Sequence, residues 1–71
     1  MEYPIRRKLG RKIKELREKY DYTQEELSEI ADIDYKYIQR IEGKHPPALK
    51  IDTIVKLAKA LKVKPYNLLK F

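Results

Sequence analysis

Apolar residues recur every three or four positions along most of the chain, which is the spacing of an amphipathic helix. In residues 5–19 the apolar positions are Ile5, Leu9, Ile13 and Leu16. In residues 51–62 they are Ile51, Ile54, Leu57, Ala58 and Leu61. Pro65 suits the first turn of a short last helix over residues 65–70. These patterns predict a first, a fourth and a fifth helix.

Two shorter helices are predicted between residues 23 and 42. Thr23 is a good N-cap, and Glu26, three residues later, completes a capping box. This helix is expected to run to about Ala31. Its inward positions are Leu27, Ile30 and Ala31. Asp34 is a second good N-cap and predicts a third helix over residues 35–42. The inward positions of that helix are Ile38 and Ile41.

The segments between these helices are expected to be turns and loops. Asp32 is predicted to adopt the left-handed conformation, which Asp tolerates better than most residues, and Ile33 to insert into the core. Gly43 is expected at the C-cap of the third helix. Two adjacent prolines keep residues 43–50 a loop. The prediction is an all-α, five-helix domain that spans residues 1–71 as a single unit.

Length and composition restrict the function. A chain of 71 residues buries only about 60% of its unfolded surface, enough for one small core and no deep pocket. The absence of cysteine excludes disulfides and thiolate metal sites. The charged start is unlike a signal peptide, and no apolar run approaches the roughly 20 residues that span a bilayer. We therefore expect a cytoplasmic protein with no membrane contact, cofactor, metal or evident small-molecule ligand.

The formal net charge of +6 is unevenly distributed. Residues 1–20 carry eight Lys/Arg and three Glu, residues 21–34 carry six acids and no base, and residues 35–71 carry nine Lys/Arg and two acids. Six basic residues lie off the apolar stripe of the first helix: Arg6, Arg7, Lys8, Arg11, Lys12 and Lys14. Such a distribution fits an anionic partner met on one side, but also a solvated, charge-rich surface.

The third helix presents a polar face formed by Tyr35, Lys36, Gln39 and Arg40. The major groove is about 12 Å wide and accepts a helix, where Lys and Arg can donate to guanine and Gln can pair with adenine. The second helix begins at Gln24, where free amides and the helix dipole suit a phosphate. The two helices and their turn have the form of a DNA-binding helix-turn-helix.

The stretch TQEELSEIADIDYKYIQRIEGK resembles the helix-turn-helix of the Cro/C1 repressor family, also called the XRE or lambda-repressor-like family. The resemblance extends to LREK at the end of the first helix, IVKLAKAL in the fourth, and the pattern V-x-P-x-x-L-L after it. Within the family, the chain is similar in length to the controller proteins of restriction–modification systems. The resemblance implies a sequence-specific transcriptional regulator that binds double-stranded DNA.

The resemblance also implies roles for individual residues. Gln24 would contact a phosphate and brace the reading helix, and Tyr37 would touch the DNA backbone or pack locally. Base contacts fall to Asp34, Tyr35, Lys36 and Arg40. Asp34 is either a plain cap or an acceptor from a cytosine amine. Lys44 and His45 would contact phosphates, and Arg17 and Glu42 would form a partly buried salt bridge. The chain departs from the family where Asp32 replaces the usual Gly, and Asp34 the usual Ser or Thr.

Two other function classes are alternatives to DNA binding: an enzyme and a protein-interaction module. We do not expect an enzyme and assign no catalytic residue, because the only histidine, His45, lies in a proline loop without a nucleophile–base pair or a Gly-rich phosphate loop. The rival is a protein-interaction module, an antitoxin or a bridging factor. The acidic residues 21–34 are the main objection to DNA binding.

The C-terminal segment predicts contact with a second chain. Leu68 and Leu69 cannot both face one small core, so apolar surface near Tyr66, Leu69 and Phe71 is expected to be exposed. The alternative is that these side chains fold back and close the core. We expect a homodimer through this segment. A two-fold dimer would place two reading helices about one DNA turn apart on an inverted repeat.

Overall fold

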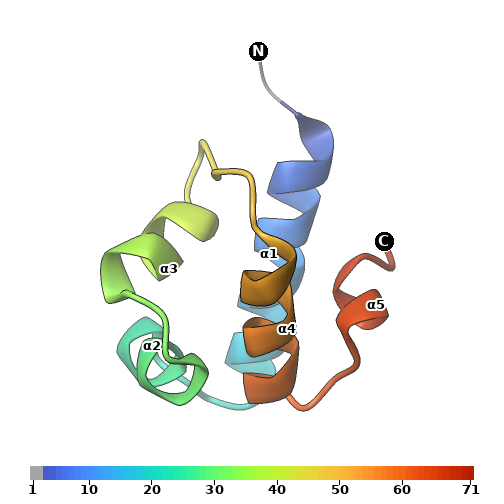
Figure 1. Ribbon diagram of the computed structural model, residues 1–71. Helices are drawn as coiled ribbons and strands as arrows, with labels where there is room; N and C mark the ends of the chain where they lie inside the picture. Colours follow the sequence, from blue (N-terminus) through green and yellow to red (C-terminus); the bar gives the residue numbers. More distant parts are fainter. Residues whose placement is uncertain (1–2) are drawn as a thin grey trace.

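The computed structural model describes residues 3–71, and within that range the chain forms five α-helices and no strand (Figure 1). They are α1 (Pro4–Lys19), α2 (Gln24–Ala31), α3 (Tyr35–Ile41), α4 (Ile51–Ala60) and α5 (Pro65–Leu68). The all-α, five-helix prediction is confirmed. The expected ends lie within two residues of those observed, and the last three helices are each slightly shorter than expected.

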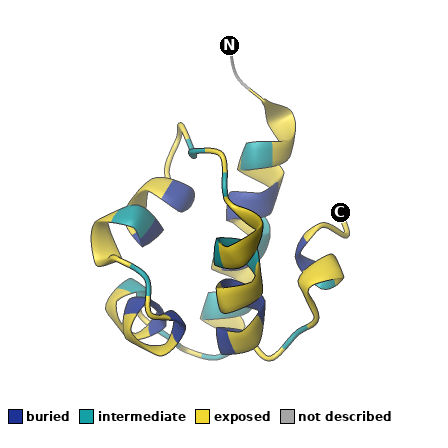
Figure 2. Cartoon of the chain, viewed as in Figure 1, coloured by how far each residue is buried: buried dark blue, intermediate teal, exposed yellow. Residues whose placement is uncertain are grey.

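One core holds the helices together. In Figure 1, α2 and α3 lie on one side of α4, and α5 lies on the other. The buried turns of all five helices face inward, while their outer faces are exposed (Figure 2). The large side chains that are fully buried are Ile13, Leu27, Ile38, Ile41, Leu57, Leu61 and Leu68. Every helix therefore contributes at least one of them, which fixes α2 and α3 relative to the rest.

Three residues predicted to face the core are instead on the surface. Ile5 is 55% exposed, Ile30 is 52% exposed and Ile51 is 78% exposed. Ile5 and Ile51 belong to the first turns of α1 and α4, at the edge of the helix packing. In α2 the buried sector runs through Leu27, Ala31 and Ser28, so Ile30 falls outside it.

Ser28 is a polar residue buried inside α2, with 8% of its surface exposed. Its hydroxyl donates to the Glu25 carbonyl oxygen at 2.6 Å, so burial leaves no unpaired donor. This local bond lets a serine lie in the buried sector of α2, where the sequence pattern predicted Ile30.

Three helices end with a non-glycine residue in the left-handed conformation. The residues are Asp21 after α1, Asp32 after α2 and Lys62 after α4, with φ of 57°, 57° and 59°. After each of them, the next amide donates back to a carbonyl five residues earlier, as in a Schellman motif. The predicted left-handed Asp32 is confirmed. The expected role of Gly43 is wrong, because α3 ends with Glu42 as its C-cap and no described glycine has a positive φ.

The close approach of α1 to the end of α3 depends on Gly10. This residue is buried, and a methyl group on it would overlap the carbonyl oxygen of Ile41. Glycine therefore lets the two helix backbones come together where any side chain would separate them. None of the helices described is both long and apolar enough to cross a membrane.

Candidate nucleic-acid interface

The two helices of the helix-turn-helix are started by their own side chains. The Thr23 hydroxyl accepts from the Glu26 amide at 3.0 Å, and the Glu26 carboxylate accepts from the Thr23 amide at 2.9 Å. The Asp34 carboxylate accepts from the Lys36 amide at 2.8 Å. Both predicted caps are therefore present. Asp34 acts as a cap in the structure, so one of its carboxylate oxygens is engaged with the backbone.

The outer face of α3 carries the polar side chains predicted to read DNA. Tyr35, Lys36, Gln39 and Arg40 are exposed, whereas Ile38 and Ile41 are buried. The Gln39 side-chain nitrogen donates to the Tyr35 hydroxyl at 3.1 Å. This bond joins two neighbours one turn apart and restricts both before any ligand binds.

Tyr37 packs locally. Its ring lies against the hydrophobic core, and its hydroxyl donates to the Ala48 carbonyl oxygen at 3.3 Å. The Arg40 guanidinium carbon lies 5.9 Å from the centre of the Tyr37 ring. Tyr37 thus connects α3 to the proline loop and supports Arg40 from beneath.

A hydrogen-bonded network around Glu42 ties α3 to α1 and α2. The Glu42 carboxylate accepts from Arg17 at 2.8 Å and 2.9 Å, and from the Gln24 side chain at 3.1 Å. A further Arg17 nitrogen donates to the Tyr22 carbonyl oxygen at 2.7 Å. The side chains of Arg17 and Glu42 are only 11% and 3% exposed. The hydrogen bond to Glu42 raises the pKa of Arg17 above its usual value, against the opposing effect of burial.

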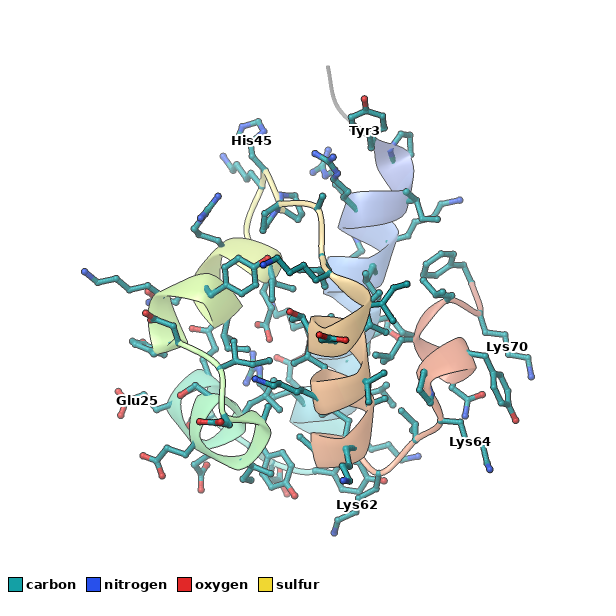
Figure 3. All side chains as sticks on the ribbon, in the orientation of Figure 1. Tyr3, Glu25, His45, Lys62, Lys64 and Lys70 are labelled. Carbon is teal, nitrogen blue, oxygen red and sulfur yellow. The ribbon has the colours of Figure 1, made fainter. Side chains whose placement is uncertain are left out.

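Gln24 and Tyr35 border one surface hollow at the start of α2. Its volume is about 490 Å³, and its lining residues are Arg17, Thr23, Gln24, Glu25 and Tyr35. The first amides of a helix have no intrahelical acceptor, so this hollow suits an anion. Glu25 works against that, because its exposed side chain projects from α2 here (Figure 3). Two predicted site residues, Gln24 and Tyr35, therefore lie together. The acidic side chain of Glu25 beside them opposes the binding of a phosphate there.

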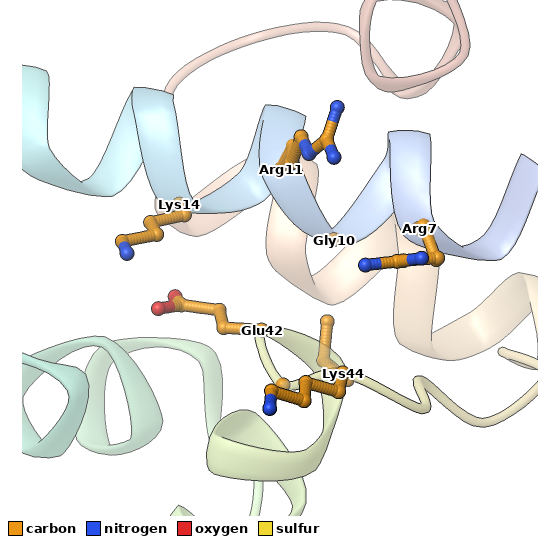
Figure 4. A pocket seen from close by; sticks show the side chains of 8 residues that line it. Arg7, Gly10, Arg11, Lys14, Glu42 and Lys44 are labelled. Atoms are coloured by element: carbon orange, nitrogen blue, oxygen red, sulfur yellow. The ribbon is translucent and has the colours of Figure 1, made fainter.

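A second pocket, between α1 and the end of α3, is mostly basic (Figure 4). Its volume is about 290 Å³, and its lining includes Arg7, Arg11, Lys14, Glu42 and Lys44. Lys44 was predicted as a phosphate contact, and the basic positions off the apolar stripe of α1 were predicted as a group, without naming which of them would reach a phosphate. The apolar stripe showed which residues of α1 lie on its outer side. Which of those six basic positions face α3 depends on the packing of the two helices.

The remaining predicted residues lie in the proline loop and at the C-terminus. His45, in the proline loop, is at the same end as Tyr3 (Figure 3). Tyr66, Leu69 and Phe71 are exposed near the C-terminus, while Leu68 between them is buried in the core. These three side chains therefore do not fold back over the core, and the apolar surface predicted near them is exposed. Within residues 3–71, no three His, Cys, Asp or Glu side chains are grouped as metal ligands would be.

Comparison with known proteins identifies the family. Residues 13–68 match a helix-turn-helix family, the Cro/C1-type or XRE group. The chain belongs to this Cro/C1-type helix-turn-helix family. No curated protein shows significant sequence similarity to it. The predicted family is confirmed, and with it the general class of DNA-binding transcriptional regulator.

Solved structures of this type superpose closely on the chain. The restriction–modification controller protein C.AhdI from Aeromonas hydrophila is 30% identical with a TM-score of 0.86, over 93% of this chain and 98% of that one. A hypothetical transcription factor, NHTF, from Neisseria is 29% identical with a TM-score of 0.86, over 93% and 75% of the two chains. A single-residue variant of the controller protein C.Esp1396I is 28% identical with a TM-score of 0.86, over 97% and 90%.

Proposed function

We propose that this Cro/C1-type protein regulates transcription by binding a specific double-stranded DNA site, with α3 inserted in the major groove. The observation that carries the proposal is the exposed polar face of α3, with Lys36, Gln39 and Arg40 held on a helix whose other face is fully buried. Lys36 and Arg40 supply donors for guanine, and Gln39 can pair with adenine. In this proposal the chain binds DNA in the cytoplasm and catalyses no reaction.

The supporting residues keep α3 at a fixed angle to the DNA backbone. Gln24 lies at the start of α2 and is hydrogen-bonded to Glu42 at the end of α3. A phosphate placed at the start of α2 would therefore be coupled to the position of the reading helix. Lys44 would hold a second phosphate beyond the other end of α3.

We further propose a homodimer that binds an inverted repeat. The exposed side chains of Tyr66, Leu69 and Phe71 form an apolar surface at the C-terminal end of the chain. Contiguous exposed apolar surface commonly marks a protein–protein contact. The similarity to two restriction–modification controller proteins supports the same role here. A neighbouring methyltransferase or nuclease gene would agree with that role, and a toxin gene would favour an antitoxin.

Selection of bound sites from random duplexes tests the proposal. We expect one enriched inverted repeat. Lys36→Ala and Arg40→Ala should each relax the preference at one position per half-site, at a cost of about 1–3 kcal/mol for the lost base contact. Lys64→Ala is the matched control, because Lys64 lies beside α5, across the molecule from α3 (Figure 3).

The outcome also separates DNA binding from a protein-interaction role. DNA binding through phosphates weakens steeply as salt increases, because condensed counterions are released on binding. Recovery of no enriched sequence, together with salt-insensitive binding to a protein partner, would contradict the proposal and favour the interaction module.

A further inference from the structure

A third pocket lies between the N-terminal turn of α1 and the loop that follows α3. Its volume is about 280 Å³, and its lining residues are Tyr3, Arg6, Arg7, Arg40, His45, Pro46 and Pro47. Figure 3 shows Tyr3 and His45 at the same end of the molecule. Among residues 3–71, the lining holds three arginines and no acidic residue. A hollow walled by one sign of charge attracts a ligand of the opposite sign, so the pocket suits an anion.

The helix dipole does not favour arginines at the N-terminal end of α1. Arg6 and Arg7 are in the first two turns of α1, whose first turn has no acidic residue. The N-terminal end of a helix carries a partial positive charge, so cations there oppose the helix dipole. The dipole of α1 therefore does not favour the positive charge of Arg6 at this position.

Two of the arginines are supported on tyrosine rings. The Arg6 guanidinium carbon lies 4.3 Å from the centre of the Tyr3 ring, and that of Arg40 lies 5.9 Å from the Tyr37 ring. A guanidinium that stacks on an aromatic face keeps its N–H donors in its own plane, directed away from the ring. The donors of both side chains are thus restricted in orientation before a ligand arrives.

The pocket is continuous with the proposed DNA surface. Arg40 belongs to the exposed face of α3, and Arg7 lines both this pocket and the adjoining basic pocket that contains Lys14 and Lys44. A row of basic positions matches a row of phosphates along a DNA strand better than it matches one small anion. This continuity selects the DNA backbone as the ligand.

We infer that the pocket binds a phosphodiester group of the DNA backbone just outside the base pairs that α3 reads. The inference rests on the proposed function and extends it. Arg6 is the principal donor, and Tyr3 is a positioning residue that holds Arg6 in place. The contact adds affinity and sets the register of α3 along the site without reading a base.

The test uses the duplex recovered by site selection, with single phosphates replaced one at a time by a neutral methylphosphonate. In the wild-type protein, one replacement outside each half-site should weaken binding several-fold. Arg6→Gln should weaken binding to the unmodified duplex by a similar factor and be insensitive to that replacement. It should also lower the slope of log affinity against log salt by about 0.9 per chain.

Three further variants separate this contact from changes in fold or total charge. Tyr3→Phe keeps the ring and should bind as the wild type does. Tyr3→Leu removes the ring under Arg6 and should lose part of the affinity for the unmodified duplex that Arg6→Gln loses. Lys64→Gln removes one positive charge beside α5 and should keep both the slope and the sensitivity to the replacement. Arg6 and Tyr3 are not part of the buried core, so thermal unfolding should be unchanged in all of these variants.

The outcomes distinguish the two proposals. If the wild type enriches a sequence but Arg6→Gln binds it with unchanged affinity and slope, the phosphate pocket is wrong and the proposed function stands. The same holds if every flanking replacement affects wild type and Arg6→Gln equally. If the wild type enriches no sequence, the proposed function and the pocket fall together.

Discussion

Glu42 is the residue that ties α3 to two other helices. Its carboxylate is almost fully buried and accepts hydrogen bonds from Arg17 of α1 and Gln24 of α2. Arg17 is bound on both edges of its guanidinium, since it also donates to the Tyr22 carbonyl. Three helices are therefore joined through one carboxylate that was predicted as half of a salt bridge.

Removing Glu42 should cost more than removing the whole pair. Glu42→Leu leaves Arg17 without its partner, and Arg17 stays charged at every practical pH because its raised pKa lies above an already high usual value. An uncompensated buried charge costs about 3–5 kcal/mol. The double variant Arg17→Met/Glu42→Leu should be more stable than Glu42→Leu, as measured by urea unfolding. A double variant that is less stable than either single variant would show that the ion pair is strongly net stabilising.

Three of the five helices in residues 3–71 end in the same way. α1, α2 and α4 are each followed by a residue with positive φ and then by a partly buried apolar residue: Tyr22, Ile33 or Val63. The left-handed residue reverses the chain so that the apolar one packs on the core. Asp tolerates this conformation through its short polar side chain, but Lys62 has no such advantage.

Lys62→Gly should therefore stabilise the fold relative to Lys62→Ala. Both variants lose the contact of the Lys62 ammonium with the Tyr20 ring, where the distance to the centroid is 5.4 Å. Only glycine relieves the left-handed backbone, worth about 1 kcal/mol. Thermal unfolding should place Lys62→Gly about 4–8 °C above Lys62→Ala. Equal melting temperatures would mean that position 62 stores no strain.

The basic surface extends over several parts of the molecule. Basic pockets follow α1, the end of α3 and the proline loop, and Phe71 at the C-terminus lies beside Lys8, Arg11 and Lys12 of α1. Residues 21–34 carry six acids, and Glu25 projects from α2 beside the first hollow (Figure 3). Although the net charge is +6, only part of the surface is basic, and the interface proposed for DNA is limited to that part.

The proposed dimer is tested by sedimentation at micromolar concentration. The wild type should show about twice the mass of one chain, and Leu69→Arg should show the mass of one chain, since a charge would be buried in the apolar contact. Ile30→Arg is the matched control, because Ile30 is an exposed isoleucine on α2, away from the C-terminus. Equal masses for wild type and Leu69→Arg would contradict a contact through this surface.

The local features were predictable from the sequence because their causes are local. The helix periodicity, the Thr23–Glu26 capping box, the Asp34 cap and the left-handed Asp32 each depend on residues within one or two turns. The exposed face of α3 was predictable for the same reason. Ile38 and Ile41 occupy the buried side of this short helix, so its polar residues must lie on the other side.

Tertiary structure decided which surfaces the helices share. The periodic pattern could not tell that Ile30 is exposed while Ser28 is buried, because the buried sector of α2 is set by the helices packed against it. Nor could it show that Gly10 lets α1 approach Ile41, or that Arg6 of α1 and Arg40 of α3 line one pocket. The sequence by itself determined the helices, the Thr23 and Asp34 caps and the family. The pockets are formed by residues more than 30 positions apart, and packing alone brings such residues together.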